Sequence, residues 1–337
     1  MNRMIATYSM LSTCADCWMK GRLRFVDCLV PQARDANLSF GSVIHECLKC
    51  WHEKRDPDAV QDIIDRAYPN RTGDDDQRHE WHLAGAMLRG YSARYPQEEF
   101  EVVVLEQPFE GLIINPATGR ASLKFKLCGK VDGVVRVGSE YYLIEHKTTS
   151  QLDGAYIDKM WSDFQTTLYA GYVERCLGYK ISGVYYNALL KARLQQSKGE
   201  TETEFETRRA DLIAKSKTGK SSAQRRMPET DEEFQARLTE KYSDPAMFHR
   251  EQLIISRDRL RAVQAHVWEM TQLYLHIQRR GVWPQNPANC FRYGKACGYH
   301  PLCSSDFSPT VRDNLYRIEP PHSELNTTST EDGQPVF

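Results

Sequence analysis

Residues 129–147 read Gly129-Lys-Val-Asp132-Gly-Val-Val-Arg-Val-Gly138-Ser-Glu-Tyr-Tyr-Leu-Ile-Glu145-His-Lys147. Valine, isoleucine, leucine and tyrosine dominate this stretch, and Gly138-Ser139 divides it as a hairpin turn does. The pattern predicts one strand over 123–137 and a second over 141–149. These two strands are the centre from which the rest of the fold is worked out.

Three ionisable residues lie inside these apolar strands. Asp132 is on the first strand, whereas Glu145 and Lys147 are on the second and share a face about 7 Å apart, because side chains alternate along a strand. A buried charge is costly unless it is paired or binds a metal. Two adjacent carboxylates repel each other unless a cation lies between them, and their hard oxygen ligands suit Mg²⁺ or Mn²⁺.

These residue types point to hydrolysis of a phosphodiester. A divalent ion on Asp132 and Glu145 can bind a phosphate oxygen and lower the pKa of a bound water. Lys147 can then steady that water or the developing charge on phosphorus. The alternative interpretation is a buried salt-bridge network in which Lys147 neutralises both carboxylates.

The rest of the chain predicts helices before the hairpin and an alternation of helix and strand after it. Gly178 has the position of a helix-terminating glycine. The predicted fold class is α/β with a mixed central sheet flanked by helices. The expected helices cover 9–20, 40–53, 58–67, 77–94, 161–178 and 257–280, and the further strands cover 101–106, 181–190 and 248–255.

Length and composition exclude several protein classes. The chain has 337 residues and a net charge of −1, with 41% hydrophobic and 26% charged residues. Such a chain can bury an ordinary core, and its bulk charge favours neither a nucleic-acid nor a membrane partner. No apolar run reaches the roughly 18 residues of a membrane span, and no signal peptide precedes the first helix. We therefore expect a cytoplasmic protein, in a bacterial or phage-infected cell, with no membrane partner.

The sequence predicts three regions. A helical N-terminal part covers 1–95 and packs on a core over 96–307, and a flexible tail with little apolar content covers 308–337. Lys, Arg, Glu, Ser and Thr dominate a tract at about 195–247, which we interpret as an insertion into the core. This insertion is either a solvated excursion with helical pieces or a basic flap that touches phosphates.

Cysteines concentrate at the two ends of the chain. Cys290, Cys297 and Cys303 are spaced C-x₆-C-x₅-C with Gly and Pro between them, and Cys14 and Cys17 stand near the start. Four thiolates suit either zinc or a [4Fe–4S] cluster. Ligands from opposite ends would tie the N-terminal helix to the C-terminus.

Two further motifs, considered with Asp132, Glu145 and Lys147, indicate a resemblance to a known family. An early helix carries Gly41-Ser-Val-Ile-His45, and the helix after the strands carries Gln165-Thr-Thr-Leu-Tyr169. In this order with Asp132 and the E-x-K pair, the motifs resemble the RecB-like branch of the PD-(D/E)XK nuclease superfamily, with a restriction-endonuclease-like core. The resemblance implies catalytic roles for Asp132, Glu145, Lys147, Gln165 and Tyr169, and metal ligation by His45, Asp132, Glu145 and the carbonyl oxygen of His146.

The terminal cysteines resemble those of the iron–sulfur-stapled nucleases of that branch, the AddB and CRISPR-adaptation types. These proteins carry one early and three late cysteines. Ser9 and Leu11 match the early pattern, which implies Cys17 rather than Cys14 as the early ligand. The implied cluster set is Cys17, Cys290, Cys297 and Cys303, although the late spacing departs from the usual C-x₂-C-x₅-C. Zinc remains the second possibility.

The sequence-level prediction is a stand-alone, phage-like, Mg²⁺- or Mn²⁺-dependent deoxyribonuclease. By family analogy, we expect an exonuclease or a processor of single-stranded ends, acting on DNA that is single-stranded or has free ends. Recombination, repair or CRISPR-type protein partners are not specified by the residues. The alternatives are a non-catalytic nucleic-acid-binding or adaptor protein on the same fold, and a zinc-stabilised scaffold.

Overall fold

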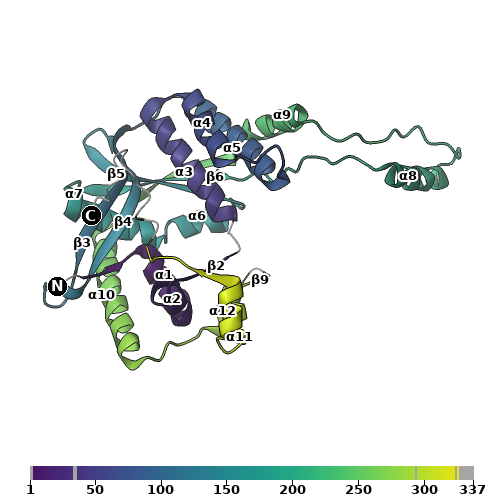
Figure 1. The fold of residues 1–337 in the computed structure, drawn as a ribbon. Helices are drawn as coiled ribbons and strands as arrows, with labels where there is room; N and C mark the ends of the chain where they lie inside the picture. The colour runs from purple at the N-terminus through teal and green to yellow at the C-terminus, as the bar shows by residue number, and fades with distance from the viewer. Residues whose placement is uncertain (1–2, 33–35, 293, 323–324, 326–337) are drawn as a thin grey trace.

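The computed structural model describes residues 3–32, 36–292, 294–322 and 325, apart from the side chains of residues 36–39. Its centre is a six-stranded mixed sheet with the order β1-β4-β5-β6-β7, in which β3 pairs with β4 on its other edge (Figure 1). The α/β class with helices around a mixed sheet is thus confirmed. The strands are β1 (Met4–Ala6), β3 (Glu101–Ile114), β4 (Ala121–Val137), β5 (Glu140–Thr149), β6 (Ile181–Leu190) and β7 (Phe248–Ile254).

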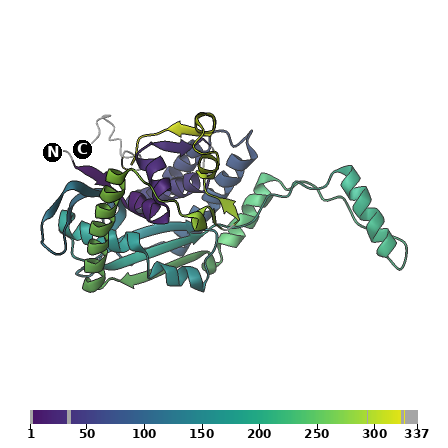
Figure 2. The ribbon, with the colours of Figure 1, turned by 90° about the horizontal axis from the view of Figure 1, so that it is seen from below.

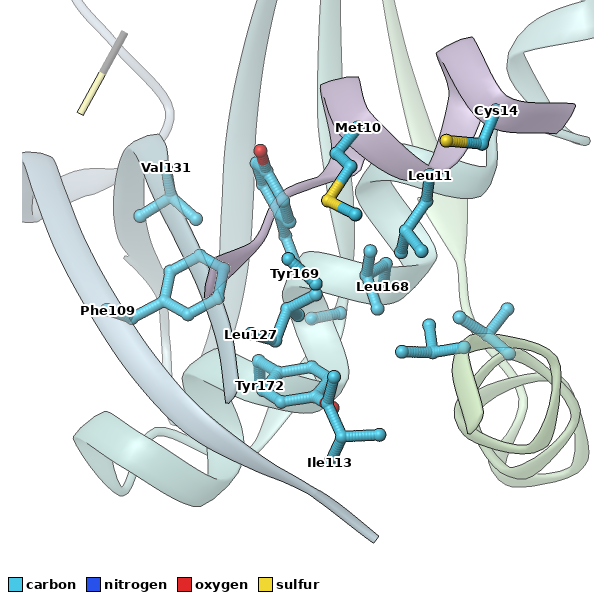
Figure 3. Close-up of a cluster of buried hydrophobic side chains, with 14 of the residues drawn as sticks. Met10, Leu11, Cys14, Phe109, Ile113, Leu127, Val131, Leu168, Tyr169 and Tyr172 are labelled. Carbon is cyan, nitrogen blue, oxygen red and sulfur yellow. The ribbon is translucent and has the colours of Figure 1, made fainter. Parts of the chain in front are cut away.

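Helices pack against the sheet in two separate apolar clusters. The larger cluster joins the sheet to α1 (Tyr8–Asp16), α7 (Phe164–Leu177) and α10 (Arg257–Arg280). Figure 3 shows part of it, where Phe109, Leu127 and Tyr172 meet Met10 and Leu11. The second cluster is formed mainly by α3 (Ala36–Lys54), α4 (Pro57–Ala67), α5 (Asp75–Arg94) and α9 (Asp231–Tyr242).

The β4–β5 hairpin forms as the sequence predicts. Gly138 adopts a positive φ of 59°, which a glycine reaches without the steric cost of a side chain. The strands pair from Val137 opposite Glu140 to Gly133 opposite Ile144. Beyond Gly133 the pairing stops, and β5 continues parallel to β6 as far as Thr149 opposite Leu190.

The prediction of one N-terminal helix over 9–20 is wrong, because this range contains two helices. Cys17 has an extended conformation, with φ −163° and ψ 120°, and separates α1 from α2 (Trp18–Phe25). The amide of Met19 donates to the carbonyl oxygen of Pro284 at 3.0 Å instead of continuing α1. A contact from the distant C-terminal segment therefore stabilises the break.

The helix predicted over 161–178 begins later than expected. Asp163 accepts a hydrogen bond from the Gln165 amide as N-cap, so α7 begins at Phe164. A separate short helix, α6 (Gly154–Met160), precedes it and was not predicted. Gly178, in the left-handed conformation with φ 79°, ends α7 as predicted.

The charged tract at 195–247 divides into two parts of different character. Helix α8 (Glu202–Lys215) buries no residue and lies at the end of an extended arm that projects from the body in both views (Figures 1 and 2). In contrast, α9 buries Phe234, Leu238 and Tyr242 in the second cluster. The insertion is therefore shorter than predicted, because the apolar residues of α9 belong to the core.

The C-terminal segment contradicts the predicted flexible tail over part of its length. Residues 309–318 form α12 (Pro309–Leu315) and β10 (Tyr316–Ile318), and β10 pairs with β2 (Leu29–Pro31). The ring of Tyr316 stacks on Tyr299 with centroids 5.7 Å apart. Tyr316 is the one residue of α12 and β10 that is buried, and it anchors the segment. The part of the predicted tail at 323–324 and 326–337 lies outside the described residues.

The connection between α10 and α12 is built from short elements. They are the 3₁₀ turn η2 (Pro287–Asn289), the two-residue strands β8 (Phe291–Arg292) and β9 (Lys295–Ala296), and α11 (His300–Ser304). A second 3₁₀ turn, η1 (Pro245–Met247), links α9 to β7. Within the described residues, no helix is both long and apolar enough to cross a membrane.

Candidate active site

The candidate site lies where β4 and β5 separate. The last pair of this ladder is Gly133 opposite Ile144, so Asp132 and Glu145 occupy the next cross-strand position. On the other edge of β4, the neighbouring pairs Leu105–Gly133 and Gln107–Val131 bracket Glu106 opposite Asp132. Three carboxylates on adjacent strands therefore form one row. Like charges at such positions are destabilising unless cations compensate them.

Asp132 lies at the centre of this row. One of its carboxylate oxygens accepts a hydrogen bond from the His146 amide at 2.7 Å, which bridges the gap between the separating strands. The other lies 3.3 Å from Nδ1 of His45 on α3. Burial raises the pKa of Asp132, but the nearby His45 outweighs it and lowers that pKa below its ordinary value. The carboxylate is therefore ionised and able to bind a cation.

His45 has an environment that favours its charged form. Burial lowers its pKa, but the neighbouring Asp132 outweighs burial and raises the pKa to about 8. A protonated imidazole cannot ligate a metal, so a bound cation would have to displace this proton.

Glu145 and Lys147 form an ion pair, and the Lys147 ammonium also donates to Oε1 of Gln165 at 3.1 Å. Only 3% of the Glu145 side chain is exposed. Burial raises the pKa of Glu145, and Asp132 raises it further against the opposing effect of Lys147. The pKa of Lys147 is raised, because Glu145 and Asp132 outweigh its burial. Lys147 is thus a fixed cation beside two carboxylates.

Glu106 is a candidate ligand that the sequence prediction missed. Within the described chain, one ligand atom from each of His45, Glu106 and Asp132 lies within 4.8 Å of the other two. Glu106 has a positive φ of 48° inside a strand, an uncommon and costly backbone for a non-glycine residue. It also forms an ion pair with Lys130. Only the cross-strand register, which the sequence does not specify, brings Glu106 opposite Asp132.

The Gln165-x-x-x-Tyr169 motif is divided between the site and the core. Gln165 reaches Lys147, as described above, but the Tyr169 ring packs edge-on against Phe109 with centroids 5.1 Å apart. A side chain at Gly129 would meet both rings, at 2.6 Å from Phe109 and 3.1 Å from Tyr169. This close approach explains the glycine three residues before Asp132.

Tyrosines form a further group around Glu145 and Lys147. Tyr8 on α1, Tyr156 on α6 and Tyr186 on β6 are close enough for their pKa values to respond to these charges, and burial raises all three. Tyr186 also donates to Asp163 at 3.5 Å. No motif connects these residues in the sequence, and the sequence prediction did not include them. They supply neutral hydroxyl donors beside the charged pair.

The side chain of His146 enters a buried polar network, and its ring lies edge-on to that of His45 with centroids 6.1 Å apart. Its Nδ1 pairs with Nδ2 of Asn187 at 2.9 Å, and its ring stacks on His52 with centroids 5.4 Å apart. Burial and His52 hold the pKa of His146 well below its ordinary value, so the ring is neutral. Further along, Arg250 pairs with the buried Glu98 at 2.5 Å. This network supports the β5 backbone beside the site.

The four predicted cluster cysteines are brought near one another from opposite ends of the chain. The Cys303 thiol has a raised pKa, first because of burial and then because of its neighbours Cys17, Cys297 and Cys290. Cys14 lies in the apolar core, where only 2% of it is exposed (Figure 3), and the cysteine that affects its pKa, after burial, is Cys17. Hydrogen bonds from Asn286 and Asn289 to the Asp16 carbonyl oxygen, at 3.0 Å and 2.9 Å, join the same two segments.

Comparison with known proteins agrees with the geometry. No curated protein matches the chain. The PD-(D/E)XK nuclease superfamily matches residues 6–304, a range that includes His45, the β4–β5 hairpin and all four clustered cysteines. The α/β fold with its mixed sheet is consistent with the restriction-endonuclease-like core of that superfamily. The chain belongs to the PD-(D/E)XK nuclease superfamily.

Proposed function

We propose that the protein is a Mg²⁺- or Mn²⁺-dependent deoxyribonuclease that acts on single-stranded DNA or at free DNA ends. Membership of the superfamily indicates a metal-dependent nuclease with DNA as its substrate. The observation that carries the proposal is the juxtaposition of Asp132 and Glu145 at the first unpaired position beyond the β4–β5 ladder, with the Lys147 ammonium beside them.

The residues that would hold the metal are His45, Asp132, Glu145 and the carbonyl oxygen of His146, together with Glu106. When bound, a divalent ion supplies a Lewis acid and lowers the pKa of a water. Lys147 donates to the attacking water or to the developing negative charge on a phosphate oxygen. Gln165 accepts a hydrogen bond from that ammonium and so fixes its direction.

Tyr169 takes a different part in this proposal. Because its ring packs on Phe109 beside Gly129, we propose that it acts by positioning the strand that carries Asp132. This role stands in place of the contact with substrate that the motif alone implies.

The terminal cysteines are proposed to hold a [4Fe–4S] cluster, with zinc as the second possibility. Cys17, Cys290, Cys297 and Cys303 fit such a group because the first three lie close enough to Cys303 to raise the pKa of its thiol, after burial. Thiolate ligands suit both metals. This proposal assigns the protein to the RecB-like, iron–sulfur-stapled branch and to a phage-like, stand-alone nuclease.

The test is a cleavage assay on linear single- and double-stranded DNA labelled at one end or the other. We expect Mg²⁺- or Mn²⁺-dependent shortening from an end, no cleavage in EDTA, and recovery when Mn²⁺ is restored. Lys147→Ala should lower the rate by at least about a hundredfold, because it removes one electrostatic stabiliser of the transition state.

The variant must keep its fold and its DNA affinity for this result to be informative. Far-UV circular dichroism and binding in Ca²⁺ check both properties. Lys180→Ala, an exposed lysine at the opposite end of β6, is the matched control and should cleave as the wild type does. Wild-type turnover in Lys147→Ala would show that the assignment is wrong.

A further inference from the structure

A cavity of about 600 Å³ lies at the carboxyl ends of β5 and β6. Its walls come from the turn after β5, the residues that follow β6, and the end of α9 with η1. In α/β sheets, ligands bind outside the carboxyl ends of parallel strands, and β5 and β6 are such a pair. The volume falls within the range of cavities that hold small organic ligands.

The charge of this cavity is predominantly positive. Lys191, Arg193 and Lys241 line it, against the single acid Asp153. Asp153 is already used as the N-cap of α6 and as an acceptor for Gln151. Lys241 has only a loose ion pair with Asp244, at 3.4 Å with both side chains exposed. Arg193 and Lys241 therefore present positive charge to an anion in the cavity.

Arg193 also fixes the shape of the cavity. Its guanidinium donates to the carbonyl oxygen of Ser150 at 2.8 Å, which joins the residues after β6 to the turn after β5. Guanidinium groups retain further donors after one such bond and match phosphate oxygens well. Leu152, Leu190 and Met247 add apolar wall. A ligand with anionic groups and flat apolar parts, such as a nucleotide chain, fits this lining.

The cavity lies within a few nucleotides of the proposed scission point. Ser150 follows Lys147 by three residues, just beyond the end of β5 at Thr149, and three extended residues correspond to about 10 Å. The extended arm also begins here. The chain runs from Arg193 in the cavity wall out to α8, and it comes back through α9, whose Lys241 lines the same cavity. A strand that leaves the catalytic row would therefore pass the cavity before it reaches the arm.

We propose that this cavity binds the sugar-phosphate backbone of the same DNA strand that the catalytic row cleaves, a few nucleotides from the scissile bond. Arg193 and Lys241 contact its phosphates. This inference rests on the proposed nuclease function and adds a substrate subsite to it.

The experiment measures binding of a fluorescent single-stranded oligonucleotide to the full-length protein in Ca²⁺, between 50 and 200 mM salt. The test variant is Arg193→Gln with Lys241→Gln. The control is Lys180→Gln with Arg280→Gln, which removes the same charge from exposed positions outside the cavity. Loss of two phosphate contacts should reduce the slope of log K against log salt by about 1.4 and weaken binding about 25-fold at 0.1 M salt.

Each outcome has a distinct meaning. A reduced slope in the test variant, with a wild-type slope in the control and unchanged melting temperatures, supports the subsite. Equal slopes in the wild type and the test variant, with normal cleavage, overturn the subsite and leave the nuclease proposal standing. A free mononucleotide that stabilises only the wild type, with equal DNA slopes, also overturns it, because the cavity would then hold an effector. A wild type that neither binds nor cleaves DNA overturns the proposed function itself.

Discussion

At the scale of single residues, the site is defined by the electrostatic relation of Asp132 to its neighbours. Asp132 holds the His146 amide and lies beside His45, so it links β4, β5 and α3. Glu106 extends the row on a third strand, at the cost of a left-handed backbone. Strain of this kind persists where the surrounding structure enforces it, and at functional sites it aims a side chain.

Glu106→Gln tests whether that side chain is a metal ligand. We expect the Mn²⁺ concentration for half-maximal cleavage to rise about 10- to 100-fold, as losses around metal sites do, with a smaller change in the rate at saturating metal. Titration of cleavage against Mn²⁺ measures both quantities. Glu101→Gln, an exposed residue on the same strand, is the control. An unchanged metal requirement would assign Glu106 to its ion pair with Lys130 alone.

Metal binding should depend on pH because protons compete for the same ligands. The pKa of His45 is raised to about 8 by Asp132 against its burial, so below pH 8 the metal must displace a proton from it. The raised pKa of Glu145 adds to this competition at lower pH. Affinity should therefore rise with pH up to about 8 and then level off. Calorimetry in buffers of different ionisation enthalpy counts the released protons, and constant affinity from pH 6 to 8 would refute the assignment of His45.

At the scale of elements, the two helices of the charged tract at 195–247 differ in how much apolar surface they bury. Helix α8 has a capping box, at Thr201 and Glu204, but buries no residue. Its formation therefore depends on local hydrogen bonds, whereas α9 gains about 1.5–3 kcal/mol for each large apolar side chain that it buries. Within the described residues, Lys215, Lys217 and Lys220 at the tip have no ion-pair partner.

Deletion of the arm tests its contribution to substrate binding. Ser197 and Glu229 are joined by a backbone hydrogen bond of 2.9 Å, so residues 198–228 can be replaced by an Asn-Gly turn. The melting temperature should stay the same, because the removed helix buries nothing. The salt slope for DNA binding should fall by about 2, which corresponds to loss of the three tip lysines. A wild-type slope would show that the arm is only a solvated excursion.

At the scale of the whole molecule, N-terminal and C-terminal segments of the chain lie in contact with each other. Three contacts connect these segments. They are the hydrogen bond from Met19 to Pro284 at the α1–α2 break, the asparagine contacts to Asp16, and the β2–β10 pair. Closing so long a loop restricts the unfolded chain, and a metal bound at the proposed cysteine site would contribute directly to the free energy of folding.

Cys17→Ser and Cys14→Ser should have different effects on this junction. Cys17→Ser should remove bound iron or zinc and lower the melting temperature by several degrees, because it breaks a ligand set shared by both ends. Cys14→Ser should keep the metal and cost about 1–3 kcal/mol through a buried hydroxyl. Elemental analysis, visible absorbance and thermal melting distinguish the two. Loss of metal in Cys14→Ser alone would reverse the assignment of the early ligand.

The sequence alone determined the β4–β5 hairpin, the Asp132, Glu145 and Lys147 constellation, and the end of α7 at Gly178. These features depend on alternation, turn residues and short spacings, all of which are local. Tertiary structure alone decided that Glu106 faces Asp132, that α9 packs while α8 does not, and that Tyr169 lies in the core. Each of these depends on register or on contacts between residues far apart in the chain, and no local pattern encodes such contacts.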